Sequence, residues 1–568
     1  WNMLRLFMKR IGSSILILIL ATVTGKGLLA QNTNAYFIQF SDKVSESNIR
    51  ATLSEKALER RTKFNLSIDS YDMPVSANYI SVILQDTTIR LRYALKWHNA
   101  IVVNCTKTSL HYLTDLPFVR AVKFVGETQT LKSSEGPLFY APRLVLKDAT
   151  MKENGYTKED YGVSYAQNKQ IGVPYLHRLG YTGKGIDVAV FDAGFKNLNA
   201  IPGFLKHQAN DRLTFCYDVA QLDNLLTDAD NHGTAVTSCL GAYQLGHYVG
   251  SAPLANLFLF RTEYGATESP LEELNWCKAA ELSDSAGVDM ITSSLGYFRF
   301  DDTTLSYRHS DLDGFTSYIS LGARIAVEKG ILVLNSAGNE GDNLWRKIGT
   351  PADVATVLTI GAAGIDNQVG RFSSQGYNAK GDIKPDVVAC GVLTYVGSPN
   401  GNYYQGYGTS YATPVAAGGV ACLLQAFPGL TPLQINQLIR STASQSQNPD
   451  SIMGYGVAQF DAAYNLQQLK TAKHVVSGIV KIDPNGLIIF KVPKDVVHFD
   501  VYSVVKFLGV LPYKKHLSKG TLKGEQEVFP IPFNQRAICN QKYTIRLSTK
   551  STLVMREISN DCLILCED

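Results

Sequence analysis

The sequence predicts an α/β protein with a mostly parallel central sheet, preceded by a small α+β unit and followed by a β-rich module. Between residues 166 and 465, short apolar runs alternate with helical stretches. Such near-continuous apolar runs are typical of strands buried on both faces of a parallel sheet. Residues 31–130 combine strand-like runs with a helical stretch, and residues 470–568 carry β-type runs separated by turn residues.

Length and charge limit the classes of protein. The 568 residues are too many for one hydrophobic core, and 45% hydrophobic with 18% charged residues is an ordinary globular composition. The 54 basic and 50 acidic residues give a net charge of +4. This balance predicts neither a nucleic acid nor an anionic membrane surface as a partner.

The first 30 residues have the order of a signal peptide. Basic Arg5, Lys9 and Arg10 precede an apolar run at 15–23, and the segment closes on Ala30. The run is shorter than the roughly 20 residues that a transmembrane helix needs. We expect a secreted, cell-surface or periplasmic protein without a stable transmembrane segment; the alternative for this run is a buried core helix.

Within the first folded unit, strands are expected at 36–40 and 100–104 and a helix at 45–62. Its end, 113–125, predicts a short helix, a proline break and a strand. Residues 126–165 are polar with little periodicity, which predicts an exposed linker.

The two later parts have clearer strand signals. The principal strands of the α/β part are expected at 186–191, 255–260, 331–334 and 357–360. In the C-terminal part, strands of a small β-sandwich are expected at 475–482, 487–492, 498–505 and 543–547.

Nine cysteines are scattered without CxxC spacing, which argues against a zinc site or a dense disulfide framework. Cys562 and Cys566 lie four residues apart. A bridge between them and two free thiols both remain open.

Three polar residues stand where chemistry is expected. Asp192 follows the buried strand 186–191, and active sites of open α/β sheets lie at the carboxyl ends of strands. Taken alone, an Asp at a strand end before Gly is more often a turn or cap residue. Gly183 and Gly185 precede the strand, whereas a dinucleotide fingerprint follows one, so that class is excluded.

His232 begins a helix of small residues, and an imidazole base needs an orienting carboxylate such as Asp192. Ser410 begins another small-residue helix, whose N-terminal N–H groups favour an oxyanion. The alternatives are a packed histidine and a serine N-cap.

Together, Asp192-Ala-Gly, His232-Gly-Thr and Gly408-Thr-Ser410-Tyr-Ala-Thr-Pro resemble the three signature boxes of the subtilisin-like serine proteases, the subtilases or peptidase S8 family. The resemblance implies a three-layer subtilisin-like catalytic domain over 166–465. It implies Ser410 as nucleophile, His232 as general base and Asp192 as the group that orients the imidazole. Ser336-Ala-Gly-Asn339 resembles the oxyanion-hole box, with Asn339 as side-chain donor.

The resemblance also implies where substrate binds. Ser293-Ser-Leu-Gly296 is similar to the segment that pairs with the substrate backbone; its alternative is a strand-terminal loop. The expected substrate-binding residues are Ser293, Ser294, Leu295, Gly296, Ser336, Ala337 and Gly338.

Residues 31–130 are similar to inhibitory propeptides of secreted bacterial members, with 131–165 as linker and start of the mature enzyme. The implied partners are protein or peptide substrates and the protein's own propeptide. No cofactor is required. Structural calcium is common in the family, and Asp228 and Asp230 are the candidate ligands.

The chain departs from the family pattern at Ala193, Asn231, Ala235 and Tyr411, none of which removes a catalytic atom. A competing hypothesis is an inactive exported protein that uses the same fold for binding or scaffolding. A nucleotide-binding enzyme lacks its phosphate loop here, and a lipase-like hydrolase lacks Gly-x-Ser-x-Gly.

Overall fold

The computed structural model describes residues 33–43, 52–110, 112–128, 150–223, 226, 230–265 and 267–471, and beyond them the backbone of strands between 481 and 558. The predicted signal peptide at 1–30 therefore lies outside the described residues. A search of the described helices finds none with the length and apolar character needed to cross a membrane.

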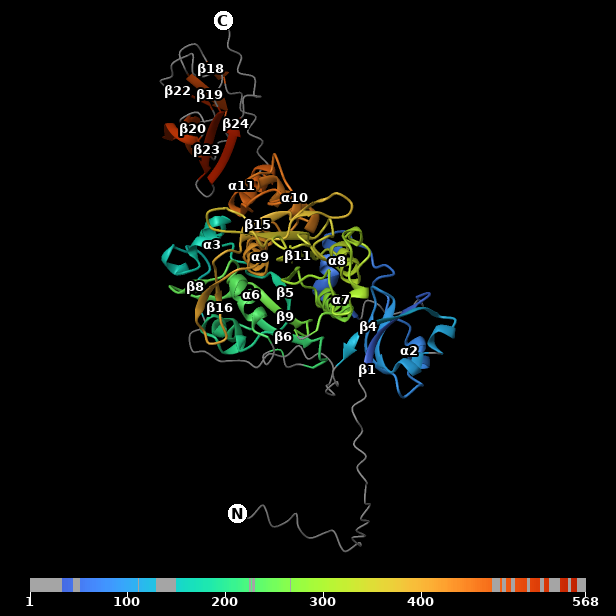
Figure 1. Cartoon of the computed structure of the whole chain (residues 1–568). Helices are drawn as coiled ribbons and strands as arrows, with labels where there is room; N and C mark the ends of the chain where they lie inside the picture. Colours follow the sequence, from blue (N-terminus) through green and yellow to red (C-terminus); the bar gives the residue numbers. More distant parts are fainter. Residues whose placement is uncertain are drawn as a thin grey trace, which may run out of the picture.

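A seven-stranded sheet forms the centre of the largest part, and every neighbouring pair of its strands is parallel (Figure 1). In spatial order the strands are β15 (Val387–Cys390), β12 (Leu358–Ala363), β11 (Leu332–Ser336), β10 (Met290–Ser293), β5 (Asp187–Asp192), β9 (Asn256–Arg261) and β6 (Leu213–Asp218). The strands predicted at 186–191, 255–260, 331–334 and 357–360 correspond to β5, β9, β11 and β12.

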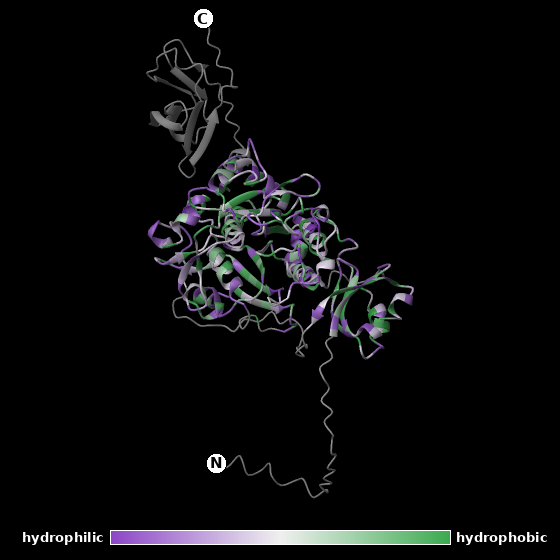
Figure 2. Ribbon diagram, viewed as in Figure 1, coloured by the Kyte–Doolittle hydropathy of each residue, from purple (hydrophilic) through white to green (hydrophobic). Residues whose placement is uncertain are grey.

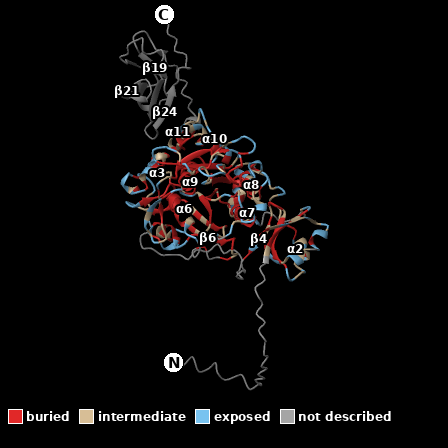
Figure 3. Ribbon diagram, viewed as in Figure 1, coloured by how far each residue is buried: buried red, intermediate tan, exposed pale blue. Residues whose placement is uncertain are grey.

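Helices cover both faces of this sheet, as the alternation of side chains along β5 shows. Val188 and Val190 join a core with α6 (His232–Gly241) and α9 (Thr409–Ala426). Ala189 and Phe191 join a second core with α7 (Pro270–Ala286) and α8 (Tyr318–Glu328). Apolar and buried residues accordingly concentrate along the sheet and the inner helix faces (Figures 2 and 3). The predicted three-layer α/β class is confirmed.

The N-terminal unit is a four-stranded antiparallel sheet with helices. The order is β2 (Arg90–Leu95), β3 (Ala100–Cys105), β1 (Thr33–Phe40) and β4 (Val119–Thr128), with α1 (Glu55–Lys63) and α2 (Ala77–Ile83). The helix predicted at 45–62 is described only from residue 55, where the Ser54 hydroxyl caps it by accepting from Ala57 N; 44–51 lie outside the described residues.

This N-terminal sheet divides its side chains between two cores. Ile38 faces α2 and the interior of the unit, whereas Phe37 and Val102 join the core that contains α7 and α8. The unit is therefore packed on the large domain through a shared apolar layer.

The expected exposed linker at 126–165 is wrong at both ends. Strand β4 continues to Thr128, and residues from 150 onward pack on the large domain. Tyr156 and Tyr161 are buried, and the Tyr161 hydroxyl donates to His177 Nδ1 at 2.7 Å. Residues 150–165 contain three tyrosines in a polar sequence. Their positions follow no regular period, so the sequence did not indicate this packing.

The C-terminal part contains two antiparallel sheets, as predicted for a β-rich module. One has the order β18 (Lys481–Ile482), β19 (Leu487–Lys491), β22 (Gln526–Pro530). The other has the order β21 (Leu511–Thr521), β20 (Val496–Phe507), β23 (Lys542–Thr549), β24 (Leu553–Ile558). Of the strand predicted at 475–482, only Lys481–Ile482 is described.

The remaining short elements complete the large domain: α3 (Tyr165–Gln170), α4 (Val173–Arg178), α5 (Leu205–Ala209), α10 (Pro432–Thr442), α11 (Phe460–Thr471), β7 (Tyr243–Gln244), β8 (Tyr248–Val249), β13 (Gly376–Tyr377), β14 (Ile383–Lys384), β16 (Thr394–Gly397) and β17 (Tyr403–Gly406). Six cysteines between 105 and 422 are free and buried; Cys539, Cys562 and Cys566 lie outside the described residues.

Candidate active site

The carboxyl end of β5 brings Asp192 to the first residue of α6. Asp192 Oδ1 lies 2.8 Å from His232 Nδ1 and also accepts from Ala193 N at 2.8 Å. Asp192 is 2% exposed, whereas a third of the His232 side chain is exposed. The pair therefore has a buried carboxylate behind an imidazole that reaches the surface.

This contact fixes the protonation pattern of His232. A carboxylate can only accept, so Nδ1 carries the proton and Nε2 of the neutral ring is left as an acceptor. The Asp192 charge raises the pKa of His232 above its ordinary value, against the opposing effect of burial. Asp230 Oδ1 accepts from His232 N at 2.7 Å and so caps the start of α6.

Ser410 is the second residue of α9. Its N-cap, Gly408, has φ 155 and leads β17 into the helix. The helix is built of Ala, Val, Gly and Thr, whose small side chains let it pack closely against the sheet. The Ser410 hydroxyl donates to Ser294 O at 3.3 Å, and the Ser294 hydroxyl donates to Ser410 O at 2.8 Å.

The first turn of α9, which carries Ser410, begins close to His232. Tyr411, the neighbour of Ser410, has its ring centroid 6.1 Å from that of His232. The backbone of α9 therefore starts beside α6, at the edge of the sheet where β5 and β10 end. Residues distant in sequence, 192, 232, 294 and 410, are gathered at this edge.

Asn339 is held in one orientation by the residue before Ser410. Asn339 Oδ1 accepts from both Thr409 N and Thr409 Oγ1, each at 3.0 Å. Because a backbone N–H can only donate, the atom facing it is the amide oxygen, and Nδ2 is left to donate elsewhere. Gly338 has φ +104, and a Cβ there would lie 2.9 Å from Ser374 Oγ, so the turn requires glycine.

Of the seven predicted substrate-binding residues, Leu295, Gly296 and Gly338 are partly or fully exposed, and the other four, including Ser294, are buried. Leu295 and Gly296 form the accessible wall. Ser293, Ser336 and Ala337 are buried and support it: Ser293 Oγ donates to Asn335 Oδ1 at 2.5 Å, while Asn335 Nδ2 and Ser336 Oγ both donate to Leu295 O. The side chains of these three buried residues do not face the surface.

Sequence reasoning missed Glu263. It lies two residues after β9, the sheet neighbour of β5, and accepts from Tyr297 Oη at 2.6 Å and Thr262 Oγ1 at 2.7 Å. Burial, more than the nearby Asp192 charge, raises the pKa of Glu263 to about 7. Its place after a neighbouring buried strand is the signal that could have found it.

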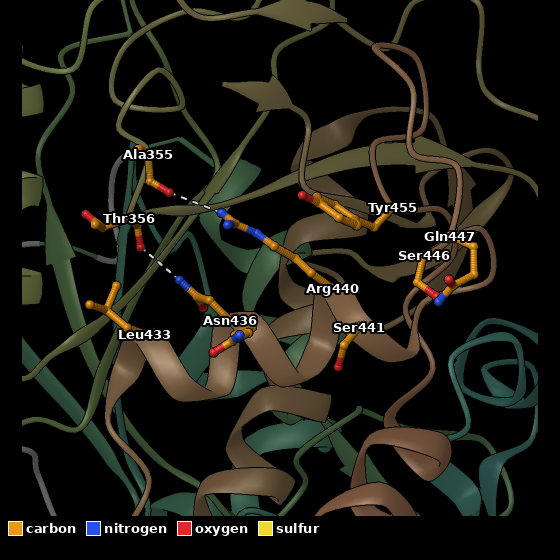
Figure 4. A pocket seen from close by; sticks show the side chains of 10 residues that line it. Ala355, Thr356, Leu433, Asn436, Arg440, Ser441, Ser446, Gln447 and Tyr455 are labelled. Carbon is orange, nitrogen blue, oxygen red and sulfur yellow. Dashed lines mark hydrogen bonds between the residues drawn. The ribbon is translucent and has the colours of Figure 1, made fainter. Parts of the chain in front are cut away.

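Two overlapping cavities lie next to Glu340, and the smaller one is also lined by Gly296. One, of 540 Å³, is lined by Glu268, Gly296, Phe298, Arg299, Phe300, Asp301, Thr303 and Glu340. The larger, of 950 Å³, shares Phe298, Arg299, Thr303 and Glu340 with it and is walled by Trp345, which stacks on Phe298 at 4.5 Å. A third cavity, of 520 Å³, is lined by Arg440 and Asn436 and shares no residue with the predicted site (Figure 4).

Within the described part of the chain, no group of three or more His, Cys, Asp or Glu side chains is arranged to hold a metal ion. Asp230 serves the helix cap described above, and Asp228 lies outside the described residues. The calcium hypothesis stays a prediction.

Comparison with known proteins finds two family models that match this chain. The subtilase family model, peptidase S8, matches residues 183–456, and a peptidase S8 propeptide domain of Bacteroidota matches residues 35–137. Subtilisin E of Bacillus subtilis is 30% identical over 325 residues, which cover 54% of this chain and 74% of that protein. The chain belongs to the subtilase family. It is thus a serine endopeptidase with a propeptide domain, as the sequence predicts.

Other subtilases are similar to the chain in the same region. Serine protease AprX of Bacillus subtilis is 30% identical over 305 residues, and the alignment spans 65% of that relative. An epidermin leader peptide processing serine protease from Staphylococcus aureus superposes with a TM-score of 0.51 and 15% identity, covering 77% of this chain and 99% of that one. This structural likeness supports the subtilase fold.

Proposed function

We propose that this subtilase hydrolyses peptide bonds through Ser410, His232 and Asp192, with an acyl-enzyme intermediate. The observation that carries the proposal is the 2.8 Å contact between Asp192 Oδ1 and His232 Nδ1. It leaves Nε2 unprotonated and directed away from the carboxylate, as a general base requires.

In the proposed first step, the Ser410 hydroxyl turns from Ser294 O toward His232 Nε2. Ser410 Oγ attacks the peptide carbonyl carbon while its proton passes to Nε2. The carbonyl oxygen becomes an oxyanion, to which Asn339 Nδ2 and Ser410 N would donate. His232 then protonates the leaving amine as the carbon–nitrogen bond breaks, which leaves an ester on Ser410.

In the second half of the reaction, water replaces the amine. His232 takes a proton from water, the hydroxide attacks the ester, and the proton returns to Ser410 Oγ as the acid product leaves. Asp192 stays ionised and stabilises the imidazolium in both halves. No cofactor is needed for this sequence.

The surroundings of the triad suit a peptide substrate. The exposed Leu295 and Gly296 continue β10, so an extended peptide could add there as a strand, with protein backbone groups as partners. The two cavities beyond Gly296 and Glu340 would take side chains that flank the cleaved bond. We further propose that residues 1–30 direct export and that the N-terminal unit inhibits the enzyme until it is cut from it.

Labelling with a fluorophosphonate serine-hydrolase probe tests the catalytic assignment. The natural chain should be labelled, and Ser410→Ala should lose both labelling and peptide hydrolysis, because it removes the one attacking oxygen. Ser441→Ala is the matched control, since it removes an exposed hydroxyl on α10 that donates to Leu438 O, outside the predicted site. Labelling that survives in Ser410→Ala would place the nucleophile elsewhere.

A further inference from the structure

Charged groups are buried where the N-terminal unit meets the catalytic domain. The catalytic domain contributes Asp187, Asp284, Asp289 and Lys329, which we call the docking face. They lie at the end of α7, the starts of β5 and β10 and the residue after α8. Each of them pairs with residues of α1 or of the loop that follows it.

Asp284 is the centre of this face and is completely buried. Its carboxylate contacts Arg60 Nη2 at 2.6 Å, Arg61 Nη2 at 2.9 Å and Lys96 Nζ at 3.5 Å. All three cations belong to the N-terminal unit. Arg60 also donates to the carbonyls of Lys329 and Asp284, and Arg61 to that of Lys329.

The other charges of the face repeat this pattern. Lys56 Nζ lies 2.7 Å from both Asp187 Oδ2 and Asp289 Oδ2. Lys329 is 2% exposed, and its Nζ lies 2.7 Å from Asp69 and 2.6 Å from Asp72.

Among the ion pairs of the residues that the structure describes, these four groups have partners only in the N-terminal unit. Moreover, Asp284 lies in the last turn of α7, where a negative charge opposes the helix dipole. The catalytic domain alone therefore gains no electrostatic stabilisation from Asp284.

Backbone geometry at the face is equally matched to α1. Gly287 ends α7 with φ +88, and a Cβ at this residue would lie 2.8 Å from Ala57 N. Lys56 and Arg60 are four residues apart, so they lie on one side of α1, and Arg61 is next to them. The docking face is thus complementary to a helix that carries cations at the positions of Lys56, Arg60 and Arg61.

We propose that the docking face is a recognition surface that selects the protein's own N-terminal unit, and that its charges serve the precursor and the non-covalent complex that follows cleavage. The shared apolar core alone would favour binding of any unit that presents a similar apolar surface. The charges supply selectivity, because a unit lacking Arg60 and Arg61 would bury Asp284 without a cation. The inference rests on the unit being a propeptide, not on the assigned triad.

The test uses the full chain carrying Ser410→Ala, so that its outcome does not depend on catalysis. A site for an added sequence-specific protease is placed within residues 131–149, the chain is cut, and retention of the N-terminal unit is followed over time by gel filtration. Asp284→Asn and Lys329→Met test the face. Glu153→Gln is the matched control, because it removes an exposed ion pair with Lys184 within the catalytic part.

The cut parent and the Glu153→Gln control should retain the unit. Both face variants should release it roughly 10²–10³-fold faster, since breaking a buried pair leaves an unpaired buried charge. Adding Arg61→Met to Asp284→Asn should accelerate release by less than the product of the two separate effects, because both changes remove one interaction. Equal retention in parent and face variants, or independent effects in the double variant, would overturn the proposal.

Thermal unfolding of the uncut chains checks that each variant is folded before cutting. Failure of the natural chain to react with the fluorophosphonate probe would overturn the triad assignment but leave this result unchanged. Each of the two proposals can therefore be refuted without refuting the other.

Discussion

Asn339 and Thr409 are joined by two hydrogen bonds, both accepted by Asn339 Oδ1 at 3.0 Å. The residue before the proposed nucleophile thus sets the orientation of the proposed oxyanion donor. Any motion of the start of α9 moves Ser410 N and Asn339 Nδ2 together, so the two proposed donors keep their relative positions. This arrangement makes the role of Asn339 testable separately from that of Ser410.

Replacing Asn339 by alanine should lower kcat by about 10²–10³-fold, the loss known for removing one such donor in this family, with little change in KM. The reason is that the donor acts on charge that appears only in the transition state. Steady-state kinetics on a chromogenic peptide measure both constants. Asn343→Ala, in the same loop, is the control and should keep kcat; an effect of Asn339→Ala on KM alone would contradict the role.

Activity should fall as pH drops through the pKa of His232, because only the neutral imidazole can accept the serine proton. The Asp192 charge raises this pKa above 6.5. The raised pKa also affects folding, because the folded state then binds a proton on His232 more tightly than the unfolded state does. This contribution to stability is therefore present at low pH and lost as pH rises through the folded value, opposite to activity.

Glu263 gives this pH profile a specific test. Its ionised form, which predominates above its own pKa of about 7, contributes to raising the pKa of His232, after the larger effects of the Asp192 and Asp230 charges. Glu263→Gln should therefore move the acid limb of kcat/KM to lower pH while retaining activity. Glu328→Gln, on the surface of α8, is the control. A limb that stays in place, or moves to higher pH, would contradict this coupling.

Tyr411 predicts resistance to oxidation. Many subtilases have methionine after the serine, whose sulfoxide is bulkier and more polar, whereas a phenol resists mild peroxide. Because the Tyr411 ring lies beside His232, Tyr411→Met would bring an oxidisable sulfur next to the triad. With cysteines blocked, Tyr411→Met should lose peptidase activity in peroxide markedly faster than the parent. Equal rates of inactivation would refute the prediction.

Tyr161 and His177 provide a stability test outside the active site. His177 Nε2 lies 3.0 Å from Ser251 O, so it donates there and Nδ1 must accept from the Tyr161 hydroxyl. Tyr161→Phe leaves that buried nitrogen unpaired, which should reduce the free energy of unfolding by about 1–3 kcal/mol. Urea denaturation of Ser410→Ala chains measures it. The control, Tyr165→Phe, should change stability little; equal losses in both would refute the explanation.

The predictable part of the fold is the part set by local pattern. The apolar run of β5 and its terminal Asp192 specify a buried strand with a functional end, and the small residues after His232 and Ser410 specify closely packed helices. The contact between Asp192 and His232 cannot be predicted from local pattern, because it depends on how α6 crosses the sheet. Resemblance to subtilases, not periodicity, supplied that pairing.

What the sequence did not predict depends on long-range partners. The Ser293 hydroxyl bonds Asn335 from a neighbouring strand, and nothing local distinguishes an inward from an outward serine at that strand end. Glu263 and Thr409 were missed for a similar reason: their roles come from Tyr297 and Asn339, which are distant in sequence. The packing of Tyr161 on His177 likewise requires knowing that α4 lies beside it.

The early packing of residues 150–165 has a mechanical consequence for maturation. Thr150 O accepts from Lys206 Nζ at 2.7 Å, and Tyr156 and Tyr161 are buried on the large domain, while Thr128 ends a strand of the N-terminal unit. A cut anywhere in 129–149 would therefore fall between residues that already pack in the N-terminal unit and residues that already pack in the large domain. Because Thr128 and Thr150 are held on opposite sides of any such cut, scission there removes no contact among the described residues.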